Sequence, residues 1–279
     1  MSCASSMRMR KPLSERALCM TIEFLSLFAL PKPLHRRSAL EPSQSSSVMN
    51  SAQSFADMRA QIHEVPNHMM CSTLPLYILA EKRPRPGNPD WAEIGCLRQN
   101  GAEGVMAYLS PVDAMIDRQD RNRHGGQFEV RPFESINPIS LIQANGGWLT
   151  VYLVYGYAAS NKRLMCDESG GLAPLAQGVS FQIDADSTEH IQLRFGPGVL
   201  RWLDRLHVKA GLLDLAQIRQ EQEKSPASDA LAQAQTAVQR INNPQPKHDE
   251  IAQCGLYDPI EQGWRFVDFA DLDGLPCHG

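Results

Sequence analysis

An acidic cluster in the second half of the chain has the residue types of a metal site. Asp184, Asp186, Glu189 and His190 lie within one short segment, and hard cations such as calcium prefer clustered oxygen ligands. The cluster lacks the glycine and the spacing of an EF-hand loop. Aspartate and serine are also typical of ordinary turns, because their side chains bond to their own backbone. We therefore interpret this segment as a turn and expect no metal.

Side chains that could serve in catalysis are present, but they form no recognisable motif. Asp113 and Asp117 are four residues apart on an expected helix and face one direction. Dipole compensation explains Asp113 and solvation explains Asp117, so neither requires a catalytic role. The chain has no nucleophile elbow, phosphate-binding loop or dinucleotide fingerprint. A Cys–His nucleophile would need the fold to bring Cys96 or Cys166 beside a histidine. We expect no catalytic residue and no cofactor.

Basic side chains gather near the end of the same expected helix. Arg118, Arg121, Arg123 and His124 favour the negative end of the helix dipole, and they also fit a phosphate or an acidic partner. Asp120 within the run and the lack of neighbouring aromatic residues argue against a nucleic-acid surface. We predict the three arginines as partner-binding residues.

Aromatic side chains give the other candidates for binding. Tyr155 and Tyr157 are typical of a strand core, but they could also line a groove or a partner surface. Trp264 and Phe266 alternate in the C-terminal segment, which could form an edge strand or bind a partner. The predicted partner-binding set is therefore Arg118, Arg121, Arg123, Tyr155, Tyr157, Trp264 and Phe266. An alternative is a small-ligand pocket near Tyr155, Arg163 and Asp167.

These residues need a sheet to position them, and residues 148–159 predict its centre. Leu149, Val151, Leu153 and Tyr155 point one way. The residues that alternate with them, Trp148, Thr150, Tyr152 and Val154, point the other way and are also largely apolar. A strand that is apolar on both sides is best satisfied as an inner strand covered on both faces.

The flanking segments predict further strands and short helices. Ser110-Pro111 and Asn137-Pro138 combine a capping side chain with a proline at the first helical position, which indicates two helix starts. Further helices are expected after Gly196 and Gly211. We predict strands at 76–80, 94–97, 104–109, 128–133, 163–166, 179–183 and 190–195, a hairpin turn at 100–101 and a loop at 167–177. The sum is an α+β domain over 74–222, with a mixed, mostly antiparallel sheet and helices packed on one side.

Both ends of the chain are expected to lie outside this domain. The first 70 residues place Arg8, Arg10 and Lys11 before an apolar run at 17–30 that Glu23 interrupts. This pattern fits a signal peptide, an organellar transit peptide or upstream sequence read as protein, and we favour the last. In all three cases we expect residues 1–70 to be disordered or non-native, apart from a short helix after Ala52. Residues 223–279 are expected to form a helical and proline-rich tail.

Composition limits the environment and the partners. The net charge of −4 gives no bulk attraction to nucleic acid or to an anionic membrane. The seven cysteines are scattered and odd in number, which favours reduced thiols in a cytoplasm over a disulfide framework.

The order of elements after residue 74 resembles a known family. A strand ends at Leu109-Ser110, a short helix begins at once, and a strand, an Asn-Pro helix and a long aliphatic strand follow. This order over about 74–166 resembles the N-terminal domain of the SseB family, the enhanced serine sensitivity proteins. Similar small modules occur in bacterial proteins tied to secretion and toxin immunity, and the resemblance implies no catalytic residue.

The sequence therefore favours a non-enzymatic bacterial protein that binds another protein in the cytoplasm. A toxin-neutralising or secretion-accessory role is the most specific version of this hypothesis. One alternative is an enzyme or a small-ligand binder with the pocket described above. Another is a structural subunit of a homo-oligomer, in which residues 264–269 supply a strand between subunits.

Overall fold

The structure is a computed structural model that describes ten segments of the chain. These segments are residues 17–22, 36–38, 52–63, 70–83, 92–99, 102–183, 190–212, 214–242, 244–246 and 251–272. The strands are β1 (Ala17–Ile22), β2 (Arg36–Ser38), β3 (Met70–Ser72), β4 (Tyr77–Lys82), β5 (Ala92–Gln99), β6 (Ala102–Tyr108), β7 (Phe128–Pro132), β8 (Trp148–Ser160), β9 (Arg163–Cys166), β10 (Pro174–Gln182), β11 (His190–Phe195), β12 (Gln245–Pro246), β13 (Gln253–Asp258) and β14 (Gly263–Asp268). The α-helices are α1 (Phe55–His63), α2 (Pro111–Arg123), α3 (Pro138–Ala144), α4 (Pro197–Ala210), α5 (Leu215–Lys224) and α6 (Ala227–Gln239).

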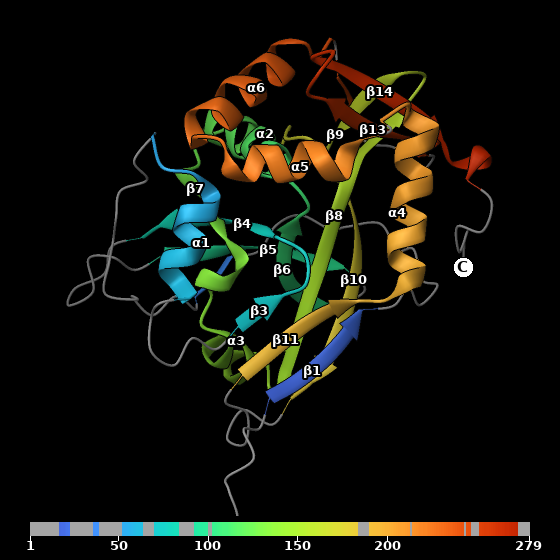
Figure 1. Ribbon diagram of the computed structural model, residues 1–279. Helices are drawn as coiled ribbons and strands as arrows, with labels where there is room; N and C mark the ends of the chain where they lie inside the picture. The colour runs from blue at the N-terminus through green and yellow to red at the C-terminus, as the bar shows by residue number, and fades with distance from the viewer. Residues whose placement is uncertain are drawn as a thin grey trace, which may run out of the picture.

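A large mixed sheet is built around β8, the strand that the alternating apolar pattern predicted (Figure 1). β8 runs parallel to β6 and antiparallel to β9, β10 and β13. Most other pairs in this sheet are antiparallel, as in β4–β5 and β4–β7. All residues of β8 from Leu149 to Ser160 are buried. The fold class and the inner position of β8 are therefore confirmed.

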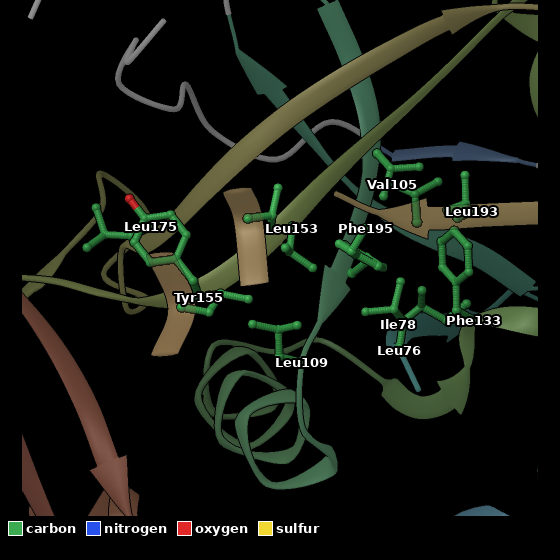
Figure 2. Close-up of a cluster of buried hydrophobic side chains, with 14 of the residues drawn as sticks. Leu76, Ile78, Val105, Leu109, Phe133, Leu153, Tyr155, Leu175, Leu193 and Phe195 are labelled. Carbon is green, nitrogen blue, oxygen red and sulfur yellow. The ribbon is translucent and has the colours of Figure 1, made fainter. Parts of the chain in front are cut away.

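A smaller parallel sheet of β1, β11 and β3 lies beside the large one. Side chains from β11 join the α4 core, which we define as the apolar cluster containing Leu153 of β8, Val199 and Leu206 of α4, and Leu193 of β11. Figure 2 shows part of this core, with side chains of β4, β6, β8 and β11 gathered between the layers. The helix α3 contributes Ile142 to the same cluster.

The other face of the large sheet carries a second cluster. We call it the α2 core, and it contains Tyr152 and Val154 of β8 together with Met115 of α2, Ala234 of α6 and Phe55 of α1. Helices therefore cover both faces of the sheet. The prediction that they all pack on one side is wrong, because α4 has an apolar stripe of its own that is buried against the opposite face.

Capping side chains determine where the helices α2 and α3 begin. Ser110 caps α2, and its hydroxyl oxygen accepts a hydrogen bond from the backbone N–H of Asp113 at 3.0 Å. Asn137 caps α3 in the same way, accepting from the N–H of Ile139 at 3.1 Å. Both starts were predicted from the capping residue and the proline that follows it.

The described parts of the first 70 residues are integrated into the fold. Phe55 of α1 is fully buried and packs edge-on against Tyr77 at 5.2 Å. Arg59 of α1 forms ion pairs with Glu134 and with Glu223, the latter at 2.8 Å. We expected this region to lie outside the fold, and for α1 the structure corrects that expectation.

The C-terminal segment is also part of the same fold rather than a tail. α6 packs its buried alanines against α2, and β13 pairs with β8 through Gly255 opposite Tyr157. The strand β10 begins at Pro174, inside the segment that we expected to be a loop, and β11 pairs with β1 and β3. The predicted turns at 100–101 and 184–189 lie outside the described residues.

Candidate functional site

A hollow lined by basic and aromatic side chains lies where the β8–β9 turn, the end of α6 and β14 meet. Its volume is about 290 Å³. We call it the basic groove, and its lining residues are Lys162, Arg163, Leu164, Arg240, Ile241, Asn242, Gly263, Trp264 and Phe266. The β8–β9 turn, the end of α6 and β14 are separate segments of the sequence, and the fold brings them together.

The β8–β9 turn positions the first two cations of the groove. Asn161 and Lys162 both have positive φ angles, 51° and 56°, which are typical of a two-residue hairpin turn with the twist of the flanking strands. The backbone N–H of Lys162 donates to the side-chain oxygen of Gln253 at 2.7 Å, which holds the turn against β13. Lys162 and Arg163 are exposed at this turn.

The third cation follows from the end of α6. Arg240 is the C-cap residue of this helix, so its charge lies near the negative end of the helix dipole. One of its guanidinium nitrogens donates to the backbone oxygen of Glu261 at 3.4 Å. This contact directs the exposed side chain toward the β13–β14 turn, beside the groove.

The aromatic wall comes from β14. Trp264 and Phe266 are two residues apart on this strand, so their side chains share one face. The indole N–H of Trp264 donates to the backbone oxygen of Ala237 at 3.1 Å, and its ring packs edge-on against Tyr157 at 5.6 Å. Both aromatic residues are half-buried rather than fully exposed, because α6 covers part of β14.

The charged side chains that line the groove have one sign. Lys162, Arg163 and Arg240 line it, and no aspartate or glutamate is among its lining residues. Like charges gathered around a partly apolar hollow produce a local positive potential that attracts acidic groups. The arrangement has the chemistry to bind an anionic segment that also carries an apolar side chain.

The three arginines predicted from α2 occupy different environments. The Arg121 Nε lies 2.8 Å from Oδ2 of Asp117, whose side chain is fully buried, and Tyr108 donates to the same carboxylate. This neighbouring charge raises the pKa of Arg121 against the opposing effect of its own burial, which is the largest influence on it. Arg118 donates to the backbone oxygen of Phe128 at 2.8 Å.

These contacts change the interpretation of the arginine patch. Arg121 is an internal ion-pair partner, so its predicted role at a partner surface is wrong for this fold. Asp117, which we expected to be solvated, is the buried half of that pair. Arg123 is exposed, and it does not line the basic groove.

Tyr155 and Tyr157 of β8 lie on opposite faces of the sheet. Gly156 is opposite Leu175 and Val154 is opposite Ala176, so Tyr155 is an extra residue in a β-bulge. The bulge reverses the alternation, placing Tyr155 in the α4 core and Tyr157 in the α2 core. Both are buried, so the prediction that they form a partner surface is wrong.

The alternative pocket is likewise divided by the fold. Arg163 lines the basic groove, whereas Tyr155 lines a separate, smaller cavity. Asp167 is occupied within its own loop, where Oδ1 accepts from the N–H of Ser169 at 2.9 Å and of Gly171 at 3.2 Å. A single pocket shared by Tyr155, Arg163 and Asp167 is therefore not formed.

Sequence reasoning named Trp264, Phe266 and Arg163 but missed Lys162 and Arg240. Each of the two missed cations is an ordinary exposed residue within its own segment, and they are far apart in the chain. The Asn161-Lys162 pair was the local signal for this turn, because asparagine favours the positive φ of a two-residue hairpin turn.

Comparisons with models of protein families, with curated proteins and with solved structures found no match to this chain. Within the described segments, no group of three or more His, Cys, Asp or Glu side chains is placed to hold a metal ion. The search of those same segments for a helix long and apolar enough to cross a membrane found none.

Proposed function

We propose that this chain is a non-enzymatic module that binds another protein through the basic groove. The observation that carries the proposal is the set of three cations around two half-buried aromatic residues, with no carboxylate in the lining. The complementary partner is an acidic segment that places an apolar side chain against Trp264 and Phe266.

The position of β14 favours a polypeptide over a small molecule. Among the described strands, β14 pairs with β13 alone, so its other edge offers backbone groups beside the groove. An extended peptide can add to such an edge through main-chain hydrogen bonds while its side chains enter neighbouring hollows. The groove volume of about 290 Å³ is also at the small end of the range for ligand pockets.

The wider setting follows the sequence hypothesis. We place this binding in a bacterial cytoplasm, which is supported by Cys166 and Cys254, thiols that form no disulfide. Toxin neutralisation and secretion assistance remain the two specific versions, in keeping with the resemblance to the SseB family. Assembly into a homo-oligomer through residues 264–269 is the competing use of the same edge.

The test uses a synthetic peptide of alternating glutamate and leucine and a matched peptide of lysine and leucine. Titration is followed by tryptophan fluorescence, since Trp264 lines the groove. We expect the acidic peptide alone to bind, with an affinity that falls as salt is raised. The double variant Lys162→Glu/Arg240→Glu should weaken it roughly tenfold or more.

The control carries the same change in net charge on another surface. Arg201 and Lys209 are exposed on α4, and Arg201→Glu/Lys209→Glu should leave the affinity of the acidic peptide within about twofold. Equal weakening in both double variants, or equal binding of both peptides, would refute the groove as the binding site. Light scattering of the wild-type protein separates the competing case, since a dimer that dissociates on deletion of residues 263–272 would favour self-assembly.

A further inference from the structure

The strand β10 has an outer edge that no other strand of the described segments covers. β10 lies beside β8 (Figure 1) and pairs with it over residues 174–182, and it pairs with no second strand in the described part of the chain. Ser180 and Gln182 are exposed at this edge. No residue of β10 lines the basic groove, so the edge is a separate surface.

A hydrogen bond at the end of β10 shows which of its backbone groups point outward. The N–H of Ile183 donates to the backbone oxygen of Gly147 at 2.8 Å, so these opposite residues form a hydrogen-bonded pair. In an antiparallel ladder such pairs alternate with pairs whose N–H and C=O groups point away from each other. Gly178, Ser180 and Gln182 therefore direct their N–H and C=O groups to the outer edge.

The side-chain contacts between the two strands agree with this direction. Side chains lie closer together in the pairs that do not exchange backbone hydrogen bonds. The Oγ of Ser180 lies 2.8 Å from the Oγ1 of Thr150, which is the residue opposite it. A methyl group at Gly178 would lie 2.4 Å from the ring of the opposite Tyr152. Both contacts place Gly178 and Ser180 in pairs whose backbone groups point outward.

The edge lacks the features that protect an exposed strand from other chains. Charged side chains, above all lysine, and prolines within the strand discourage pairing with a second strand. Residues 175–182 contain no charged residue and no proline. Trp148, which is opposite Gln182, is 44% exposed. An uncharged edge beside an exposed aromatic ring is typical of an interface.

We propose that two copies of this chain associate by pairing their β10 edges across a two-fold axis at Ser180. In this antiparallel arrangement Ser180 is opposite Ser180 of the second copy, and Gly178 is opposite Gln182 of the second copy. Each of these pairs exchanges N–H and C=O groups in both directions. Gly178 has no side chain to oppose Gln182, and the large sheet continues from one copy into the other.

The lack of charge on this edge favours a second copy over a charged partner. The acidic segment proposed for the basic groove has no complementary cation among residues 175–182. A two-fold arrangement requires only that the surface is complementary to itself, and the outward backbone groups centred on Ser180 meet this condition. The association is independent of the groove, whose lining lies at the β8–β9 turn, the end of α6 and β14.

The test measures the mass of the full-length protein by sedimentation equilibrium between roughly 1 and 100 µM. We expect a reversible dimer in this range, because an interface built on one strand edge is small. Ser180→Pro removes the outward N–H at the centre of the interface and leaves the hydrogen bonds from β10 to β8 in place. It should raise the Kd of the dimer about thirtyfold or more.

The matched control is Ser180→Ala. Like the proline variant, it loses the hydroxyl contact with Thr150, but it keeps the backbone N–H. Its dimer Kd should remain within about threefold of the wild-type value. A wild-type protein that stays monomeric at roughly 100 µM would overturn the proposal. Equal Kd values for Ser180→Pro and Ser180→Ala would do the same.

Two charged variants test the same pairing without a proline. Ser180→Lys and Ser180→Glu each place like charges opposite each other across the axis, and each should weaken its own dimer about threefold. An equimolar mixture should form mixed dimers in preference, as measured by energy transfer between labelled chains. A statistical mixture of dimers would show that Ser180 is not at the axis, and the proposed pairing would be wrong.

Discussion

The buried imidazole of His207 makes a quantitative prediction about stability in acid. Burial and the charge of Arg219 lower its pKa to about 2 in the folded protein, against roughly 6.5 in an unfolded chain. Between these two values the unfolded chain binds a proton that the folded protein does not. The stability contributed by the neutral imidazole is therefore fully present above pH 6.5 and is lost as the pH falls below it.

The size of the effect follows from the unfolded pKa. At pH 7 the folded histidine is neutral and roughly three quarters of the unfolded histidine is neutral, whereas pH 5 lies roughly 1.5 units below the unfolded pKa. At about 1.4 kcal/mol per unit, His207 should cost about 2 kcal/mol of unfolding free energy between these two conditions. The folded pKa is far below 5, so its exact position does not enter this value.

Urea denaturation at pH 7 and pH 5 measures this difference. We expect His207→Gln to lose about 2 kcal/mol less on acidification than the wild-type protein. The carboxylates of the two proteins are identical and contribute equally. If His207→Gln lost as much stability as the wild type, the imidazole would be protonated in the folded state and our account of its burial would be refuted.

Three further predictions concern packing, and urea denaturation at pH 7 measures each. Phe55→Ala should cost about 3–5 kcal/mol because this side chain is fully buried, and a neutral result would show that α1 is not packed on the sheet. Gly156→Ala should cost roughly 1–3 kcal/mol, since the new methyl group would lie 2.5 Å from Sγ of Cys254 and 3.0 Å from the backbone oxygen of Gly255. Asp117→Ala should cost about 3–5 kcal/mol by leaving Arg121 buried without its carboxylate, and Arg121→Met should partly restore the loss.

Local patterns in the sequence were sufficient for the main elements of the fold. The alternation around Leu153 placed an inner strand, and Ser110 and Asn137 placed two helix starts, because capping and side-chain direction depend on neighbouring residues. The thin apolar stripe of α6 was harder to interpret. Its buried residues are mainly alanines such as Ala234, which let the helix approach α2 closely.

Features that depend on contacts distant in sequence were not predictable. The basic run on α2 is typical of a solvated surface, and the burial of Asp117 depends on Tyr108 in the preceding strand as well as on Arg121. The bulge at Tyr155 depends on its pairing with β10, a strand whose first residues have the composition of a loop. The cations of the groove were missed because Lys162 and Arg240 meet only after β9, α6 and β14 assemble.

The bulge in β8 turns two nearby tyrosines to opposite faces of the sheet. Tyr155 packs against Trp202 of α4 on one side, and two residues later Tyr157 packs against the indole of Trp264 on the other. Replacing one of these tyrosines should therefore alter the contacts of one face and leave those of the other face in place. A change at Gly156, which sits between the two tyrosines and abuts Cys254, would disturb both at once, so that position divides local effects from those transmitted through the main chain.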